Sequence, residues 1–386
     1  MFDSLIKFVR ELYRSNDFIP LHRPYFKGNE KKYLEAAIDS TFVSSVGDSV
    51  KEFESKISEF TGINYAVATV NGTAALHLAL KVAGVERNTE VITQSLTFVA
   101  TCNAIDYCGA TPVFVDVNRS SAGLDPLSLK DFLDSNCIVK DDGFCWNLDS
   151  NKKILACLPM HTFGLPAQLD ELKSICKEYK ITLIEDAAES LGSLYKKKHT
   201  GSVGLLSTLS FNGNKIITTG SGGMILTNNK DLAKRVKHLS TTAKQPHAWD
   251  FYHDEIGFNY RLANLNAALG IAQLELLPSY IKNKRWIAEQ YFDWGKKMDV
   301  SFLKESKDAK SNYWLNTLIV NDKETRDALL KETNKNNIMT RPVWTPMHQL
   351  DIYKKCKRGD MTNTEWLFDR LVSLPSSIVD YPYRLN

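Results

Sequence analysis

A single lysine stands between a short polar turn and a cluster of glycines near the middle of the chain. Lys215 ends the run Ser210-Phe211-Asn212-Gly213-Asn214-Lys215, and Gly222-Gly223 follow soon after it. Upstream, the apolar segment Ile181-Thr182-Leu183-Ile184 reads as a strand and is followed by Glu185-Asp186. An enzyme that depends on pyridoxal phosphate (PLP) needs an amine that links to the cofactor and a carboxylate beside its pyridine nitrogen. We therefore hypothesise that Lys215 holds PLP and that Asp186 is the partner of its ring.

The residues that follow the expected strand 65–70 suggest a binding site for the phosphate of the cofactor. The next residues are Asn71-Gly72-Thr73-Ala74-Ala75, and a helix is expected over 73–82. A glycine turn before a helix start presents free backbone N–H groups that bind phosphate, and Ser210 offers a hydroxyl to the same group. Each residue also has a plain structural alternative: Thr73 and Asp186 as helix caps, and Lys215 as a surface lysine. Their order and spacing together favour the cofactor site.

A histidine follows a further expected strand. Residues 154–159 form an apolar run, and Met160-His161 come directly after it. Ligands of an open parallel sheet bind at the carboxyl ends of its strands, so His161 is a candidate contact for a substrate. A structural role for the same histidine is an equal alternative.

The elements around these residues alternate between strands and helices up to about residue 230. The strands are continuous apolar runs, and the helices between them have amphipathic spacing. Strands are expected at 65–70, 90–92, 112–117, 154–159 and 181–184. This alternation predicts the α/β class, with a mainly parallel sheet covered by helices on both faces.

The pattern changes in the last third of the chain, which predicts a smaller α+β domain. Residues 240–254 are polar and mixed, and we expect a loop there. Pro278 is expected to stop a helix over 262–277, before a second helix over 280–294. The remaining expected elements are strands at 313–320 and 338–343 and helices at 323–334 and 364–374. We divide the chain into an N-terminal helical arm (1–20), a large PLP-binding domain (21–255) and a small C-terminal domain (256–386).

Composition limits the classes of protein that this chain can be. Its 386 residues are 43% hydrophobic and 24% charged, as in ordinary globular proteins, and the net charge of +3 gives no support for a nucleic-acid partner. The seven cysteines are scattered without a CxxC pair, so neither a disulfide framework nor a metal site is suggested. Reduced thiols and the absence of any run approaching the roughly 20 apolar residues that span a bilayer favour a cytoplasmic protein without a membrane partner.

Taken together, these segments resemble the DegT/DnrJ/StrS family of PLP-dependent sugar aminotransferases, over essentially the whole chain after residue 20. The details Ser44-Ser45-Val46-Gly47, Phe211-Asn212-Gly213-Asn214-Lys215 and Arg341-Pro342-Val343-Trp344 are most similar to the LegC-type subgroup of the legionaminic acid and bacillosamine-type pathways. The other matching segments are 71–76, 96–98, 161–164, 185–188, Gly222-Gly223, 257–262 and 340–342.

The resemblance implies a fold-type-I aminotransferase that is a homodimer with active sites at the subunit interface. Lys215 matches the lysine that links to PLP, and Asp186 matches the partner of the pyridine nitrogen. Phe98 matches the aromatic residue stacked on the ring. The remaining implied cofactor contacts are Gly72, Thr73, the Ala74 backbone and Ser210 at the phosphate, Glu189 near the ring hydroxyl, and Asn259 and Arg261 reaching the cofactor of the other subunit.

Glu189 departs from the family pattern, because many relatives carry glutamine or histidine at its position. A carboxylate beside an anionic ring hydroxyl is repelled unless it is protonated or paired. For the substrate we expect contacts from His161 and from Arg341, whose guanidinium suits a pyrophosphate.

The resemblance also implies the reaction. Glutamate gives its amine to the cofactor, and a nucleotide-linked 4-keto-6-deoxy (N-acetyl)hexose then accepts that amine at C-4. Two alternatives remain: a PLP-dependent sugar dehydratase and a non-catalytic sugar-nucleotide-binding protein on the same fold. Relatives that dehydrate carry histidine where this chain has Lys215, and the presence of both Lys215 and Asp186 argues against a binding protein.

Overall fold

The centre of the protein is a mixed sheet whose main path runs β1-β11-β10-β7-β6-β2-β3. The computed structural model describes residues 1–381. From β10 to β3 every pairing is parallel, whereas β11 runs antiparallel to both β1 and β10. The mainly parallel sheet predicted from the sequence is confirmed. The strands are β1 (Tyr65–Thr69), β2 (Glu90–Gln94), β3 (Thr111–Val115), β6 (Lys152–Leu158), β7 (Thr182–Asp186), β10 (Leu206–Ser210) and β11 (Gly223–Thr227).

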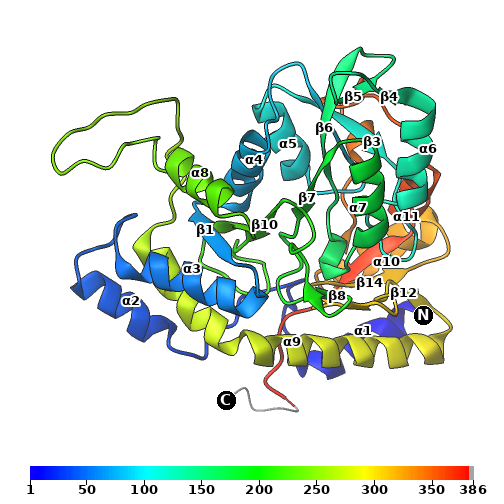
Figure 1. Cartoon of the computed structure of the whole chain (residues 1–386). Coiled ribbons are helices and arrows are strands. Elements are labelled where there is room, and N and C mark those ends of the chain that lie inside the picture. The colour runs from blue at the N-terminus through cyan, green and yellow to red at the C-terminus, as the bar shows by residue number, and fades with distance from the viewer. Residues whose placement is uncertain (382–386) are drawn as a thin grey trace.

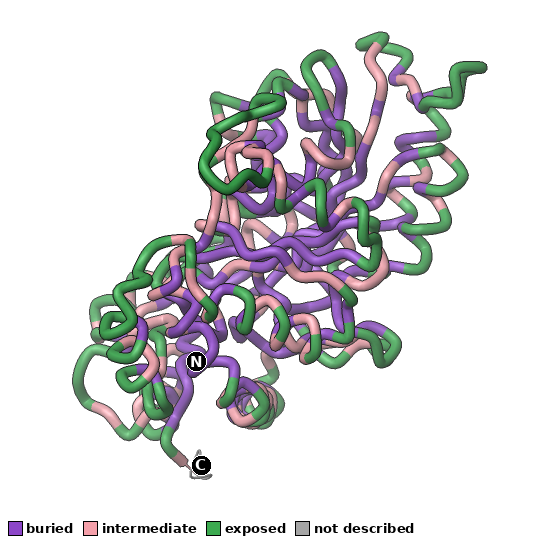
Figure 2. The backbone as a smooth tube through the Cα atoms, turned by 60° about the vertical axis from the view of Figure 1, so that its left-hand side comes forward, coloured by how far each residue is buried: buried purple, intermediate pink, exposed green. Residues whose placement is uncertain are grey.

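Helices cover both faces of this sheet, because apolar side chains point to both sides of its strands. Val67, Ala156 and Ile184 face α4, α5 and α8. Their neighbours along the same strands face the other side, where Ala68 packs with α3 and α9, and Cys157 and Leu183 pack with α6 and α7. Figure 1 shows these two helical layers, and Figure 2 shows the buried strands between them. The helices are α3 (Asp48–Thr61), α4 (Gly72–Val82), α5 (Val99–Tyr107), α6 (Pro126–Asn136), α7 (Leu169–Glu178), α8 (Lys230–Ser240) and α9 (Asn264–Met298).

A second, antiparallel sheet near the C-terminus has the order β12-β14-β16-β15. It packs with α1, α10 and the end of α9 in a separate apolar core. Its strands are β12 (Ser301–Phe302), β14 (Asn316–Ile319), β15 (Arg341–Pro342) and β16 (Leu371–Leu374), and the helices beside them are α1 (Phe2–Tyr13), α10 (Lys323–Lys335) and α11 (Thr362–Phe368). The smaller α+β part is thus present, whereas the domain boundaries at residues 20 and 255 stay a prediction.

Two element predictions in this part were wrong. Pro278 does not end a helix: α9 continues through it. A proline removes one hydrogen bond from a helix, but here the helix is held by buried residues on both sides of it, including Leu277 and Tyr280. The expected helix over 364–374 ends at Phe368, and Leu371–Leu374 forms the strand β16 instead, because it pairs with both β14 and β15.

The remaining elements are short. A hairpin of β4 (Cys137–Val139) and β5 (Cys145–Asn147) extends the sheet beside β6. A second hairpin, β8 (Leu194–Tyr195) and β9 (Lys198–His199), pairs with β13 (Ala309–Lys310). The last elements are α2 (Glu30–Asp39) and the single turns η1 (Thr162–Gly164) and η2 (Met347–Gln349). Within residues 1–381 no helix has the length and apolar character needed to cross a membrane.

Candidate active site

A cavity of about 300 Å³ opens where β7 and β10 end and where α4 and α5 begin. This is the carboxyl edge of the parallel strands, where the fold places ligands. The predicted residues that line it are Gly72, Thr73, Phe98, Asp186, Glu189, Ser210 and Lys215. The lining residues without a predicted role of their own are Asn71, Leu76, Ala100, Thr101, Met160, Ala188, Asn212, Asn214, Ser221, Gly222, Trp314 and Trp344.

The amine of Lys215 has two contacts at the wall of this cavity. Its Nζ lies 3.3 Å from Oε1 of Glu189 and 4.1 Å from the centre of the Trp314 ring. The other carboxylate oxygen of Glu189 accepts a 2.9 Å hydrogen bond from the backbone N–H of Phe163. Burial raises the pKa of Glu189 to about 7, although the charge of Lys215 and the Phe163 N–H act against that rise. Lys215 and the Phe163 N–H thus favour the ionised form of Glu189, against the burial that favours the neutral acid.

Asp186 stands at the end of β7 and is held by two donors. Its Oδ2 accepts a 2.8 Å hydrogen bond from the hydroxyl of Thr101, and its Oδ1 accepts a 3.1 Å bond from the N–H of Ala188. The pKa of Asp186 is raised by burial, while the bond from Thr101 lowers it. Thr101 lies in the first turn of α5, three residues after Phe98. That three-residue spacing places both residues on one side of the helix start. It could have indicated from the sequence alone that Thr101 belongs to the site.

The start of α4 approaches β10 so closely that a side chain at position 72 would crowd Ser210. A Cβ on Gly72 would lie 3.0 Å from the Cβ of Ser210. Asn71 caps the helix by accepting a 2.8 Å bond from the N–H of Ala74. Among the described residues, the amides of Gly72 and Thr73 have no hydrogen-bond partner. They are available for a phosphate, whereas the predicted contact from the Ala74 backbone is not supported, because its N–H already binds the Asn71 side chain.

Aromatic side chains from distant segments form another wall of the cavity. Phe98 is 49% exposed, and its ring centre lies 6.1 Å from that of Trp344. Phe163 is buried and does not line the cavity, but its ring centre lies 5.2 Å from that of Trp344 and 6.5 Å from that of Trp314. The two tryptophans belong to the C-terminal part of the chain, so this wall joins residues that are far apart in sequence. Trp344 ends the segment 341–344 named in the sequence analysis, whereas Trp314 belongs to no local motif.

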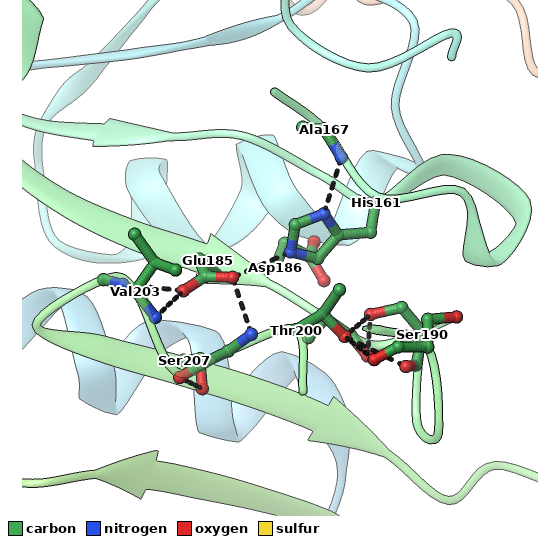
Figure 3. Close-up of polar contacts among 12 residues, drawn as sticks. His161, Ala167, Glu185, Asp186, Ser190, Thr200, Val203 and Ser207 are labelled. Atoms are coloured by element: carbon green, nitrogen blue, oxygen red, sulfur yellow. Dashed lines mark hydrogen bonds and ion pairs between the residues drawn. The ribbon is translucent and has the colours of Figure 1, made fainter. Parts of the chain in front are cut away.

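His161 is not at the cavity, and the predicted substrate contact is not supported. Its ring is fully buried, its Nδ1 accepts from the N–H of Ala167, and its Nε2 lies 2.9 Å from Glu185. Glu185 also accepts bonds from the backbone N–H groups of Gly201, Val203 and Gly204 (Figure 3). These bonds and His161 lower the pKa of Glu185 despite its burial. His161 therefore has the structural role that the sequence left open.

Three other predicted residues lie outside the lining of this cavity. Arg341 is exposed, and its guanidinium contacts the carbonyl of Thr340 and the side chain of Asn334. Arg261 donates a 2.7 Å bond to the carbonyl of Ser45 and lines a second cavity of about 630 Å³. Asn259 is exposed, and its backbone forms a bridge with Thr241. Within one chain, none of these side chains reaches Lys215.

Comparison with known proteins decides the family. The model of the DegT/DnrJ/EryC1/StrS aminotransferase family matches residues 24–378. The chain belongs to this family. It is 36% identical to a GDP-perosamine synthase of Escherichia coli O157:H7, over 93% of this chain and 94% of that protein. It is also 36% identical to the putative pyridoxal phosphate-dependent aminotransferase EpsN of Bacillus subtilis (strain 168), over 93% and 90% of the two chains.

Solved structures share the fold. A DegT DnrJ EryC1 StrS aminotransferase from Brucella abortus superposes with a TM-score of 0.82 at 25% identity, covering 92% of this chain and 91% of that one. Aminotransferases of the DegT family depend on PLP. The cavity fits that cofactor, because one wall has a lysine amine, another has a buried aspartate, and a third has two unpartnered amides beside a serine hydroxyl. We therefore describe the chain as a PLP-dependent sugar aminotransferase of the DegT family.

Proposed function

We propose that this DegT-family enzyme moves the amino group of L-glutamate to C-4 of a nucleotide-linked 4-keto-6-deoxy (N-acetyl)hexose, for bacterial surface-sugar biosynthesis. The observation that carries the proposal is the meeting of Lys215 and Asp186 at one cavity, beside the free start of α4. The GDP in the name of a 36% identical relative supports a nucleotide-linked substrate. The LegC-like segments 44–47, 211–215 and 341–344 support an N-acetylated sugar of the legionaminic acid or bacillosamine type.

The residues at the cavity have separate roles toward the cofactor. When bound, PLP supplies an electron sink that makes the C–H bond beside the transferred nitrogen acidic. Lys215 would hold the cofactor covalently, and Asp186 would keep the ring nitrogen protonated. Gly72, Thr73 and Ser210 would bind the phosphate, and Phe98 would cover the ring. Thr101 acts on the cofactor through Asp186, since its hydroxyl donates to that carboxylate.

Lys215 also moves a proton in both halves of the reaction. Its free amine would remove the proton from Cα of glutamate in the first half and would deliver a proton to C-4 of the sugar in the second half. In the net reaction, glutamate loses its amino group and two electrons to become 2-oxoglutarate. The keto carbon of the sugar gains that amino group and is reduced to the amine, so no further oxidant or reductant is needed.

We propose that the enzyme works as a homodimer whose cavities are completed by the neighbouring subunit. Among the residues described as lining the cavity, Lys215 is the only cation, although both substrates carry anionic groups. Arg261 and Asn259 lie outside the cavity of their own chain and are our candidates for contacts in the partner's site. The nearby loop 244–256 extends away from the body in Figure 1 and exposes Trp249 (82%) and Ile256 (88%), as expected of a surface that a second copy covers.

The proposal has a direct test of the second half of the reaction. The enzyme is loaded with amino groups from L-glutamate, freed of the donor by gel filtration, and mixed with UDP- or GDP-linked 4-keto-6-deoxy sugars. We expect one sugar to gain nitrogen, seen by mass spectrometry, with the amine placed at C-4 by NMR. A product that has lost water and gained no nitrogen would instead identify a dehydratase. We expect the activity in the cytoplasmic fraction, since all seven cysteines are free thiols.

A further inference from the structure

Trp314 touches the lysine segment at two points, and no family motif used above includes it. The face of its ring lies 4.1 Å from the amine of Lys215. Its Nε1–H donates a 2.7 Å hydrogen bond to the carbonyl of Asn214, the residue directly before the lysine. One side chain therefore contacts both the backbone that carries Lys215 and the charged end of its side chain.

The indole itself is held rigidly. Trp314 is 4% exposed, and its backbone N–H donates a 2.9 Å bond to the side chain of Asn312. The amide group of Asn312 in turn donates 2.9 Å bonds to the carbonyls of Glu189 and Leu191. Asn312 thus connects the backbone at Trp314 to the backbone of the segment that carries Glu189.

Lys215 thus lies between two groups that favour a positive charge. Glu189 offers a carboxylate oxygen at 3.3 Å, and the indole offers the negative face of its π system. The lysine side chain is only 13% exposed, so water screens neither contact strongly. Both contacts favour a free ammonium at this position.

We propose that Trp314 is a positioning residue that holds the free ammonium of Lys215 at the cavity wall, opposite Glu189, in the state in which the lysine is not linked to the cofactor. A long, flexible side chain would otherwise sample many rotamers, and each turnover needs it to return to the same place. The inference rests on the proposed role of Lys215, and its test uses the protein without cofactor.

The test measures the reactivity of Lys215 in the full-length, cofactor-free protein. Acetic anhydride labels the exposed, uncharged amine, and mass spectrometry reads the extent of labelling at each lysine. Trp314→Leu removes the ring face and the N–H, whereas Trp314→Phe keeps an aromatic face and removes only the N–H. At pH 7 we expect Lys215 of Trp314→Leu to be labelled about tenfold faster than in the parent protein, and that of Trp314→Phe less than about threefold faster.

Trp366 provides a matched control in the same protein. It stacks with the guanidinium groups of Arg119 and Arg370 at 4.6 and 4.7 Å and does not line the cavity. Trp366→Leu removes an indole with the same kind of contact, and we expect no change in Lys215 labelling. If Trp314→Leu does not give folded protein, Trp314→Met, whose longer and more flexible side chain also lacks a π face, takes its place with the same expectation.

Two results would overturn the proposal. One is equal labelling of Lys215 in the parent and in Trp314→Leu. The other is equal acceleration in Trp314→Phe and Trp314→Leu, since the bond to Asn214 or simple packing would then explain the effect. A failure of the proposed function is recognised separately: in that case borohydride reduction of the PLP-loaded parent protein would leave no pyridoxyl group on Lys215, as read by mass spectrometry, whatever the labelling rates show.

Discussion

The amine of Lys215 lies 3.3 Å from a carboxylate oxygen of Glu189, and both side chains are at the same cavity. A lone carboxylate at the position of Glu189 would be costly to bury. The structure shows how the chain accommodates it, through one ion pair and one backbone N–H from Phe163.

Replacing the lysine should abolish turnover. We expect Lys215→Ala to lower kcat by about 10³-fold or more, because both the covalent link and the proton carrier are lost. The measurement is the rate of 2-oxoglutarate release, with Lys284→Met as the control: Lys284 is also a buried lysine, but it lies outside the cavity and binds the carbonyl of Ser376. Substantial transamination by Lys215→Ala would show that Lys215 is not the catalytic lysine.

Asp186 and Thr101 should act as one unit. Asp186→Asn is expected to lower kcat by about 10²-fold, because a neutral amide no longer stabilises a protonated ring nitrogen. Thr101→Val should lower kcat about tenfold, because one hydrogen bond to a buried carboxylate is lost. Thr101→Ser keeps the hydroxyl and should stay close to the parent. If Thr101→Val added its full loss on top of Asp186→Asn, the threonine would be acting on something other than the aspartate.

Glu189 should make the stability of the cofactor-free protein depend on pH. Its folded pKa is raised to about 7 from an ordinary 4.5, so between these values the folded state binds more protons than the unfolded state. The protonated Glu189 therefore adds to the free energy of unfolding below pH 4.5, and this contribution is lost as the pH rises through 7. Glu189→Gln should remove up to about 3 kcal/mol of that dependence, measured by urea unfolding between pH 5 and 8. Parallel stability curves for the two proteins across this range would contradict the raised pKa.

The sharing of sites between subunits can be tested by mixing two inactive variants. If Arg261 serves the partner's site, Arg261→Ala and Lys215→Ala homodimers are both defective. Subunit exchange would then create dimers in which one site has an intact lysine from one chain and an intact arginine from the other. We expect activity to return to about a quarter of the parent value after random exchange. If exchange is shown by native mass spectrometry and no activity returns, Arg261 acts within its own chain.

Many residues of this site could be predicted from the sequence, because they follow strand ends and helix starts in a fixed order. Asp186, Ser210 and Thr73 were located in this way, and the structure brings them to one cavity. His161 occupies the same kind of place, but its side chain turns into the core toward Glu185, and strand position alone does not tell the direction of a side chain. The Ala74 amide was expected to bind the phosphate. In the structure its N–H donates to the side chain of Asn71, which caps the helix.

The contribution of the C-terminal part could not be predicted in the same way. Trp314 and Trp344 reach the cavity only because the small sheet packs beside the large one, and contacts between such distant segments leave no periodic signal. The prediction of a helix over 364–374 was wrong for a related reason. Leu371–Leu374 became a central strand because two partners were available in the folded chain, and tertiary pairing overrides local spacing.

The visible absorbance spectrum of the purified protein, before and after L-glutamate, tests the central claim most directly. We predict an absorbance band of lysine-linked PLP that is lost when glutamate is added and that returns when the correct nucleotide-linked keto-sugar follows. A band that glutamate leaves unchanged would contradict the proposed donor and reaction. The absence of any band after PLP is supplied would contradict the cofactor site itself and would favour a protein that binds sugar nucleotides without catalysis.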